Sequence, residues 1–163
     1  MQLSEHFKLE EFTRSDTAKM KGIDNTPSDL VVKNLRALCE NTLEPLRQRI
    51  GLPLHISSGY RSPELNMAIG GTSNSQHCEG KAADIICFGM TITDLFEEAS
   101  KFVPYDQCIH EFGRWVHLSY SNPLRRMKLW AVKQDGKTEY LHSDPKQADE
   151  SKTLLQITKT PTV

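Results

Sequence analysis

The chain has 163 residues, of which 37% are hydrophobic and 25% charged, and its formal net charge is −1. This length and composition predict one folded domain with its own core, and the balanced charge is not typical of a protein that binds nucleic acid or an anionic membrane. No segment approaches the roughly 20 apolar residues of a membrane-spanning helix. The first residues lack the basic start and apolar run of a secretory signal, so we expect a protein made for the cytoplasm.

The sequence of the first third of the chain predicts mainly helices. Leu9 to Phe12 suit a short helical turn, and the mostly polar residues 17–25 are typical of a loop. Thr26 and Pro27 then predict a helix start, with Thr as the N-cap and Pro in the first position. Apolar residues follow at steps of three to five, which indicates one long amphipathic helix that Pro45 should kink. These apolar residues are Val31, Leu35, Leu38, Leu43, Leu46 and Ile50.

The centre of the chain predicts strands that alternate with shorter helices. The expected strands cover residues 54–58, 82–87, 105–110 and 115–120, and the last two are joined by a tight turn at 112–114. The expected helices cover residues 63–69 and 91–102, the second capped by Thr91. A final hairpin is expected from residues 128–132 and 138–141 around Asp135-Gly136. Together these elements predict an α+β domain with a small antiparallel-rich sheet and flanking helices.

The four cysteines do not form a metal-binding pattern. Cys39, Cys78, Cys87 and Cys108 contain no C-x-x-C pair. Unpaired cysteines prefer protein interiors, so we expect free, mostly buried thiols, with a single disulfide as the alternative.

Three polar side chains stand out because of their surroundings. His77 ends a glycine-flanked loop, and Asp84 follows seven residues later in an apolar strand, where a carboxylate needs a metal, a cation or hydrogen-bond donors. His117 lies in another apolar strand. Two imidazoles and one carboxylate, with a fourth position open for water, are a typical catalytic zinc ligand set. Spacing alone leaves a second interpretation open, namely a hydrogen-bonded core histidine and a capping aspartate.

Four segments add a family resemblance to this pattern. They are Ser57–Ser62 with its Ser-Gly-Tyr-Arg run, Ser75–His77, Gly80–Asp84 and Trp115–His117. Together they resemble the zinc D-alanyl-D-alanine carboxypeptidase family, most closely its small phage and bacterial peptidases. The superfamily also includes lysostaphin-type enzymes and the sonic hedgehog domain. The resemblance implies a hedgehog-like fold and a zinc peptidase domain over residues 1–123. Residues 124–163 are expected to form a C-terminal hairpin and a loose tail of the same domain.

The resemblance also implies roles for individual residues. His77, Asp84 and His117 match the family's zinc ligands, so one zinc ion per chain is expected. Arg61 matches the arginine that binds the carboxylate of the substrate or the developing oxyanion, a role that suits a planar guanidinium. A structural salt bridge is the alternative role for Arg61.

The general base is the point at which the sequence departs from the family pattern. Many relatives carry an acidic residue three positions before the last histidine, where this chain has Arg114. Glu111 lies six residues before His117, a spacing that the hedgehog domain shares, and a short turn would fold it back beside His117. Glu111 is therefore the expected base. Asp106 is the alternative, although it falls on the opposite face of a regular strand.

The resemblance implies a peptidoglycan stem peptide as substrate. It would be cut either by a D,D-carboxypeptidase or by an L-alanyl-D-glutamate endopeptidase. An enzyme without a signal peptide would reach the cell wall after release, as a phage or prophage lysis enzyme does, although a role in wall recycling fits equally well. The alternative is a non-catalytic zinc module that binds a peptide or protein, which Arg114 favours. No nucleic acid or membrane partner is expected.

Overall fold

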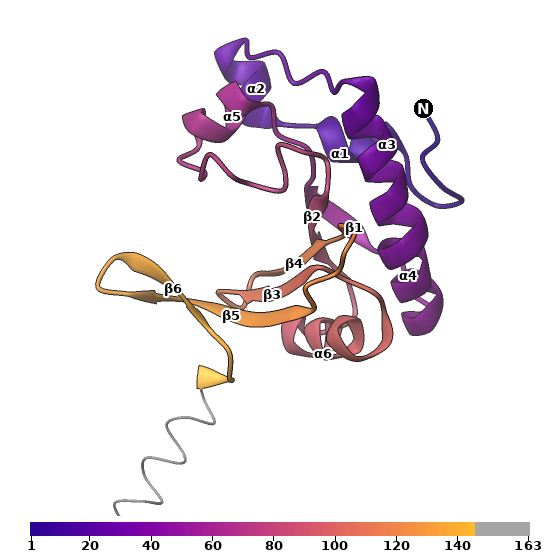
Figure 1. The fold of residues 1–163 in the computed structure, drawn as a ribbon, viewed down its shortest axis with the longest axis vertical. Helices are drawn as coiled ribbons and strands as arrows, with labels where there is room; N and C mark the ends of the chain where they lie inside the picture. Colours follow the sequence, from indigo (N-terminus) through magenta and orange to yellow (C-terminus); the bar gives the residue numbers. More distant parts are fainter. Residues whose placement is uncertain (146–163) are drawn as a thin grey trace, which may run out of the picture.

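A six-stranded sheet organises the part of the chain that the computed structural model describes, residues 1–145 (Figure 1). The strands lie in the order β1-β2-β4-β3-β5-β6, and every neighbouring pair is antiparallel except β3 and β5, which are parallel. Their bounds are His55–Ser58 (β1), Ala82–Ile86 (β2), Gln107–Glu111 (β3), Trp115–Ser119 (β4), Met127–Gln134 (β5) and Lys137–Leu141 (β6). The predicted α+β fold with an antiparallel-rich sheet is confirmed.

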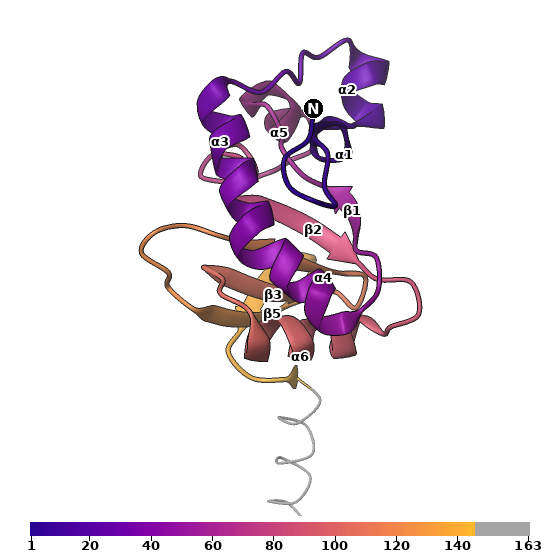
Figure 2. The ribbon, with the colours of Figure 1, turned by 90° about the vertical axis from the view of Figure 1, so that its right-hand side faces the viewer.

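Helices flank this sheet and form much of the N-terminal part of the chain. They are α1 (Leu9–Thr13), α2 (Asp16–Lys21), α3 (Asp29–Leu38), the π-helical turn η1 (Cys39–Leu43), α4 (Glu44–Ile50), α5 (Pro63–Ala68) and α6 (Ile92–Phe102). Helix α6 lies along one side of β3 and β5, whereas α3, η1 and α4 run as one rod past β2 (Figure 2). None of the helices within residues 1–145 is long and apolar enough to cross a membrane.

The two faces of the sheet differ in chemistry because side chains alternate along each strand. One face packs with the long helical rod and α6 into the main core. Its buried strand residues include Ala83, Ile85, Cys108, Val116 and Leu118. The strand residues that alternate with these project to the opposite face, and they include Asp84, Ile109, Glu111 and His117. The polar side chains that the sequence singled out therefore share the face turned away from the main core.

The start of the long helix differs from the prediction. The N-cap is Ser28, whose hydroxyl accepts a hydrogen bond from the Val31 N–H at 3.4 Å, so the expected cap at Thr26 is wrong. The N–H of Thr26 instead donates to the Asp24 carboxylate at 2.8 Å, which holds this residue in a local turn ahead of the helix. The helix therefore begins two residues later than the sequence indicated.

The expected irregularity near Pro45 is a π-helical turn. Proline has no N–H to donate to the carbonyl four residues before it. The turn preceding it widens, so that the N–H of Glu44 donates to the carbonyl of Cys39, five residues back. The rod continues beyond this turn as α4, which ends at Gly51 in the left-handed conformation.

The prediction of a loop at residues 17–25 is wrong for its first part, which forms α2. The Ser15 hydroxyl caps this helix by accepting from the Ala18 N–H at 3.2 Å, and Gly22 ends it with a φ of 65°. The buried methyl group of Ala18 ties the helix to the rest of the fold. Such a short segment has too few apolar residues for a periodic signal, so only its caps could have indicated it.

The remaining strands and helices form close to their expected positions. The C-terminal hairpin is confirmed, since β5 and β6 pair antiparallel on either side of Asp135-Gly136. All four cysteines are free, and only Cys78 is not fully buried. The expected loose tail falls almost entirely on residues 146–163, outside the described residues.

Asp106, directly before β3, joins three segments of the chain. Its side chain is fully buried, and its carboxylate accepts from the backbone N–H and the guanidinium of Arg125, each at 2.9 Å, and from the Gln76 amide at 2.8 Å. Hydrogen bonds from Arg125 hold the pKa of Asp106 well below its usual range and outweigh the opposing effect of burial. Asp106 therefore anchors both the segment before β5 and the loop that precedes β2.

Replacing Asp106 with Asn should destabilise the fold in a pH-dependent way. A carboxyl group whose pKa is lowered by folding stabilises the protein above its unfolded pKa of about 4, and this stabilisation is lost as the pH falls toward the folded pKa. We expect Asp106→Asn to lower the free energy of unfolding by about 2–4 kcal/mol at pH 7, and by less at pH 3. Urea unfolding at both pH values measures this difference, with Asp135→Asn in the exposed β5–β6 turn as the control. An equal loss at both pH values would contradict the assignment.

Candidate metal centre and active site

Two of the three predicted ligands are cross-strand neighbours. Asp84 on β2 pairs directly with His117 on β4, so both side chains project from the same face of the sheet. The Oδ1 atom of Asp84 lies 3.0 Å from Nδ1 of His117. His77 reaches this pair from the loop before β2, and its Nε2 atom lies 3.2 Å from Nδ1 of His117 and 3.3 Å from Oδ1 of Asp84. The structure thus brings together all three side chains that the sequence singled out.

A second loop orients the imidazole of His77. The ring donates a hydrogen bond from Nδ1 to the carbonyl of Gly59 at 2.6 Å, which leaves the lone pair of Nε2 directed at Asp84 and His117. The N–H of Arg61 donates to the carbonyl of His77 at 3.3 Å, so the two loops also hold each other through their backbones. Gly59 allows this contact, because a Cβ there would lie 2.6 Å from the backbone of Phe12.

The three ligand atoms fit a zinc ion. Zinc bonds of about 2.0–2.1 Å place neighbouring ligands of a tetrahedral ion about 3.3 Å apart. The three atoms lie 3.0–3.3 Å from one another, and the side chains are 3%, 8% and 7% exposed for His77, Asp84 and His117. A second polar partner on His77, such as the Gly59 carbonyl, is also usual for a zinc-binding histidine. Nitrogen and oxygen donors in this compact, buried arrangement favour a metal over a purely structural cluster.

The electrostatics of the cluster favour the protonation states that bind a metal. Burial lowers the pKa of His77 more than Asp84 raises it, so the imidazole is held neutral. For Asp84, burial alone would raise the pKa, but the adjoining imidazoles and their hydrogen bonds bring it well below its usual value. A neutral imidazole and an ionised carboxylate are the forms in which these residues coordinate metal ions.

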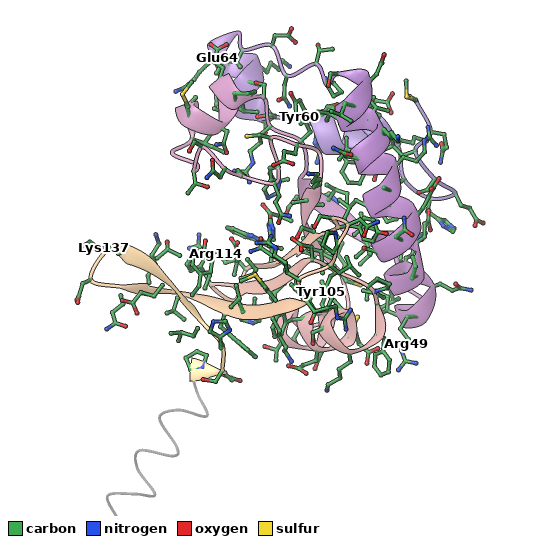
Figure 3. All side chains as sticks on the ribbon, in the orientation of Figure 1. Arg49, Tyr60, Glu64, Tyr105, Arg114 and Lys137 are labelled. Carbon is green, nitrogen blue, oxygen red and sulfur yellow. The ribbon has the colours of Figure 1, made fainter. Side chains whose placement is uncertain are left out.

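Glu111 lies on the same face of the sheet as Asp84 and His117, two of the three predicted ligands. It pairs with Trp115 across β3 and β4, and the Trp115 indole donates to its Oε2 atom at 3.0 Å. Burial and the charge of Asp84 raise the pKa of Glu111, whereas His117 lowers it, so the carboxylate is within electrostatic reach of two predicted ligands. Arg114, where relatives carry an acid, is an exposed residue of the turn between these strands (Figure 3).

Asp106, the alternative base, has its carboxylate engaged elsewhere. Arg125 and Gln76 donate to its two oxygens. Through Gln76 it supports the residue next to His77, which is a structural role. Glu111 is the acidic residue whose position fits a base, and its assignment stays a prediction.

Arg61 lies in the loop that follows β1, next to the predicted ligand His77 in this region of the fold. Its positive charge lowers the pKa of both His77 and Glu111, as the smallest of the effects on each. Its Nε atom is buried without a hydrogen-bond partner, and within residues 1–145 no carboxylate lies at ion-pair distance from it. The alternative role in a structural salt bridge therefore gains no support, and the side chain is suited to bind an external anion.

Asn25 is a residue of this region that the sequence did not single out. Its amide donates to the carbonyls of Thr13 and Tyr60, at 2.9 and 3.2 Å, and accepts from the N–H of Ser62 at 2.7 Å. It thus fixes the loop that carries Arg61 to the N-terminal segment. Its place in a polar loop gave no signal, because these partners are distant in sequence.

Comparison with known proteins identifies the family of the chain. Residues 5–119 match the family described as peptidase M15, a span that contains the three predicted ligands together with Arg61 and Glu111. No curated protein matches the chain. The matched span contains all four segments through which the sequence resembles the zinc D-alanyl-D-alanine carboxypeptidases. The chain belongs to the peptidase M15 family of metallopeptidases.

Proposed function

We propose that this chain is a zinc-dependent peptidase that hydrolyses peptidoglycan stem peptides. The observation that carries the proposal is the triangle of Nε2 of His77, Oδ1 of Asp84 and Nδ1 of His117, whose edges match those of a tetrahedral zinc site. Glu111 and Arg61 lie within electrostatic reach of this triangle and supply a candidate base and a candidate anion-binding group. Ligands, base and cation together are the parts that metal-assisted peptide hydrolysis requires.

Glu111 would move the proton in this reaction. When zinc is bound by His77, Asp84 and His117, it supplies Lewis-acid chemistry that acidifies water and polarises the peptide carbonyl. Trp115 engages one oxygen of the Glu111 carboxylate, which leaves the other oxygen, Oε1, to accept a proton from the attacking water. The same carboxyl group can then return the proton to the leaving amine.

Arg61 would bind negative charge on the substrate. Its guanidinium can grip a carboxylate with two parallel hydrogen bonds, or stabilise the oxygen of the peptide carbonyl as charge develops there. A terminal carboxylate next to the scissile bond would suit a D,D-carboxypeptidase, and the free carboxylate of a D-glutamate would suit an L-alanyl-D-glutamate endopeptidase. Both substrates present an anion that Arg61 would bind.

The second candidate function is a zinc module that binds a peptide without cutting it. Arg114 favours this alternative, because it replaces the acid that many relatives use. The position of Glu111 weighs against it, since this carboxylate shares the sheet face with the ligands and is held by Trp115.

Replacing Glu111 with Gln should abolish hydrolysis and leave metal binding intact. Glutamine keeps the size of the side chain and an oxygen for the Trp115 indole, but it cannot accept the proton, so we expect kcat to fall about 10²- to 10⁴-fold. Elemental analysis should still find one zinc ion per chain. Glu64→Gln, at an exposed position on α5, is the matched control. A fully active Glu111→Gln variant would remove the base assignment.

Incubation with purified muropeptides separates the possible activities. We expect hydrolysis that a zinc chelator stops and that added zinc restores, with the products identified by mass spectrometry. Loss of a single alanine identifies the carboxypeptidase, and cleavage into two peptide-bearing fragments identifies the endopeptidase. Intact muropeptides in the presence of a chain that retains its zinc would favour the binding module instead.

A further inference from the structure

The register of the sheet places a tyrosine of the C-terminal hairpin in line with Glu111. Trp115 pairs with Glu111, Glu111 pairs with Ala131 on β5, and Ala131 pairs with Tyr140 on β6. Paired residues of neighbouring strands project to the same face, so these four side chains form one row across β4, β3, β5 and β6. This row runs beside the one that contains Asp84 and His117.

Ala131 lets Tyr140 and Glu111 approach each other. Neighbouring strands lie about 4.8 Å apart, so β6 is about 10 Å from β3, a gap that a glutamate and a tyrosine can bridge when they lean toward each other. The residue between them is an alanine that is only 2% exposed, and its methyl group leaves room for the phenol above it. Tyr140 itself is 53% exposed, so part of its side chain remains open to a substrate.

The charges of the metal centre act on this phenol. Burial raises the pKa of Tyr140, and the negative charges of Glu111 and Asp84 raise it further. A tyrosine with a pKa above its ordinary value of about 10 keeps its proton at neutral pH. The hydroxyl is therefore a hydrogen-bond donor at the edge of the site.

We propose that the hydroxyl of Tyr140 donates a hydrogen bond to the carbonyl oxygen of the peptide bond that is cut. Arg61 lies beyond the β1 end of the sheet and Tyr140 on its β6 edge, so the two donors flank Glu111 and the ligands from opposite sides. The β5–β6 hairpin becomes one wall of the substrate site, although it lies outside residues 5–119 that match the family. This inference rests on the proposed peptidase function.

Steady-state hydrolysis of a muropeptide by the zinc-loaded full chain tests the inference. Tyr140→Phe keeps the ring and removes only the hydroxyl. We expect kcat to fall about 10- to 100-fold, because a donor aimed at the developing oxyanion acts mainly in the transition state. KM should stay within about threefold of the wild-type value. Zinc content and the midpoint of thermal unfolding should not change. Glu139→Gln, an exposed neighbour on the opposite face of β6, should behave like the wild type.

Three outcomes would overturn the inference. An unchanged kcat in Tyr140→Phe would exclude the hydrogen bond to the scissile carbonyl, whether or not KM rises. A fall in kcat accompanied by loss of zinc or of thermal stability would assign a structural role to the hydroxyl. A wild-type chain that cuts no muropeptide would remove the proposed function along with this inference, whereas an active wild type with a fully active Tyr140→Phe would remove this inference alone.

Discussion

The pairing of Asp84 with His117 across β2 and β4 is the constraint on which the site depends. In a sheet with one buried face, a shift of a single residue would turn every side chain of a strand to the other face. Such a shift of β4 would bury His117 in the core and expose Val116 and Leu118, both of which are 0% exposed. The hydrophobic core therefore fixes the register, and the register brings the two predicted ligands together. Burial of apolar surface thus stabilises the fold and positions the candidate metal centre with the same contacts.

The position of the third predicted ligand, His77, depends on packing between loops rather than on the sheet. His77 is held by the carbonyl of Gly59, and Gly59 can reach it only because its missing side chain lets the loop lie on Phe12 of α1. On the other side of His77, a Cβ on Gly80 would lie 2.7 Å from Val31 of α3. Because they lack side chains, Gly59 and Gly80 let the loop after β1 and the loop that carries His77 pack closely against the N-terminal helices. This explains why so much of the chain before β1 is needed to build a site that lies mostly on the sheet.

The parts that could be predicted from the sequence are those with a local signal. A carboxylate and a histidine inside apolar strands violate the strand pattern, so the sequence alone singles out Asp84 and His117. The long helix followed from its apolar period, and α6 from its Thr91 cap. The short helix α2 was missed because its only signals are its caps. The role of Asn25 was missed because it depends on hydrogen bonds to residues distant in sequence. The choice between Glu111 and Asp106 also depends on distant partners, since only the folded chain shows that Arg125 and Gln76 occupy the Asp106 carboxylate.

The Asp106–Arg125 pair links the sheet face that carries the predicted ligands to the C-terminal hairpin. Strand β4 lies on one side of β3 and β5 on the other, so the chain between them must pass around the end of β3. At this crossing the N–H of Met127 donates to the carbonyl of Asp106 at 2.9 Å, while Arg125 bonds the carboxylate of the same residue. The pair therefore fixes where β5 begins against β3, and with it the register that aligns Ala131 with Glu111 and Tyr140 with Ala131. An aspartate whose carboxylate is engaged by Arg125 and Gln76 thus determines which side chain of the hairpin is aligned with Glu111.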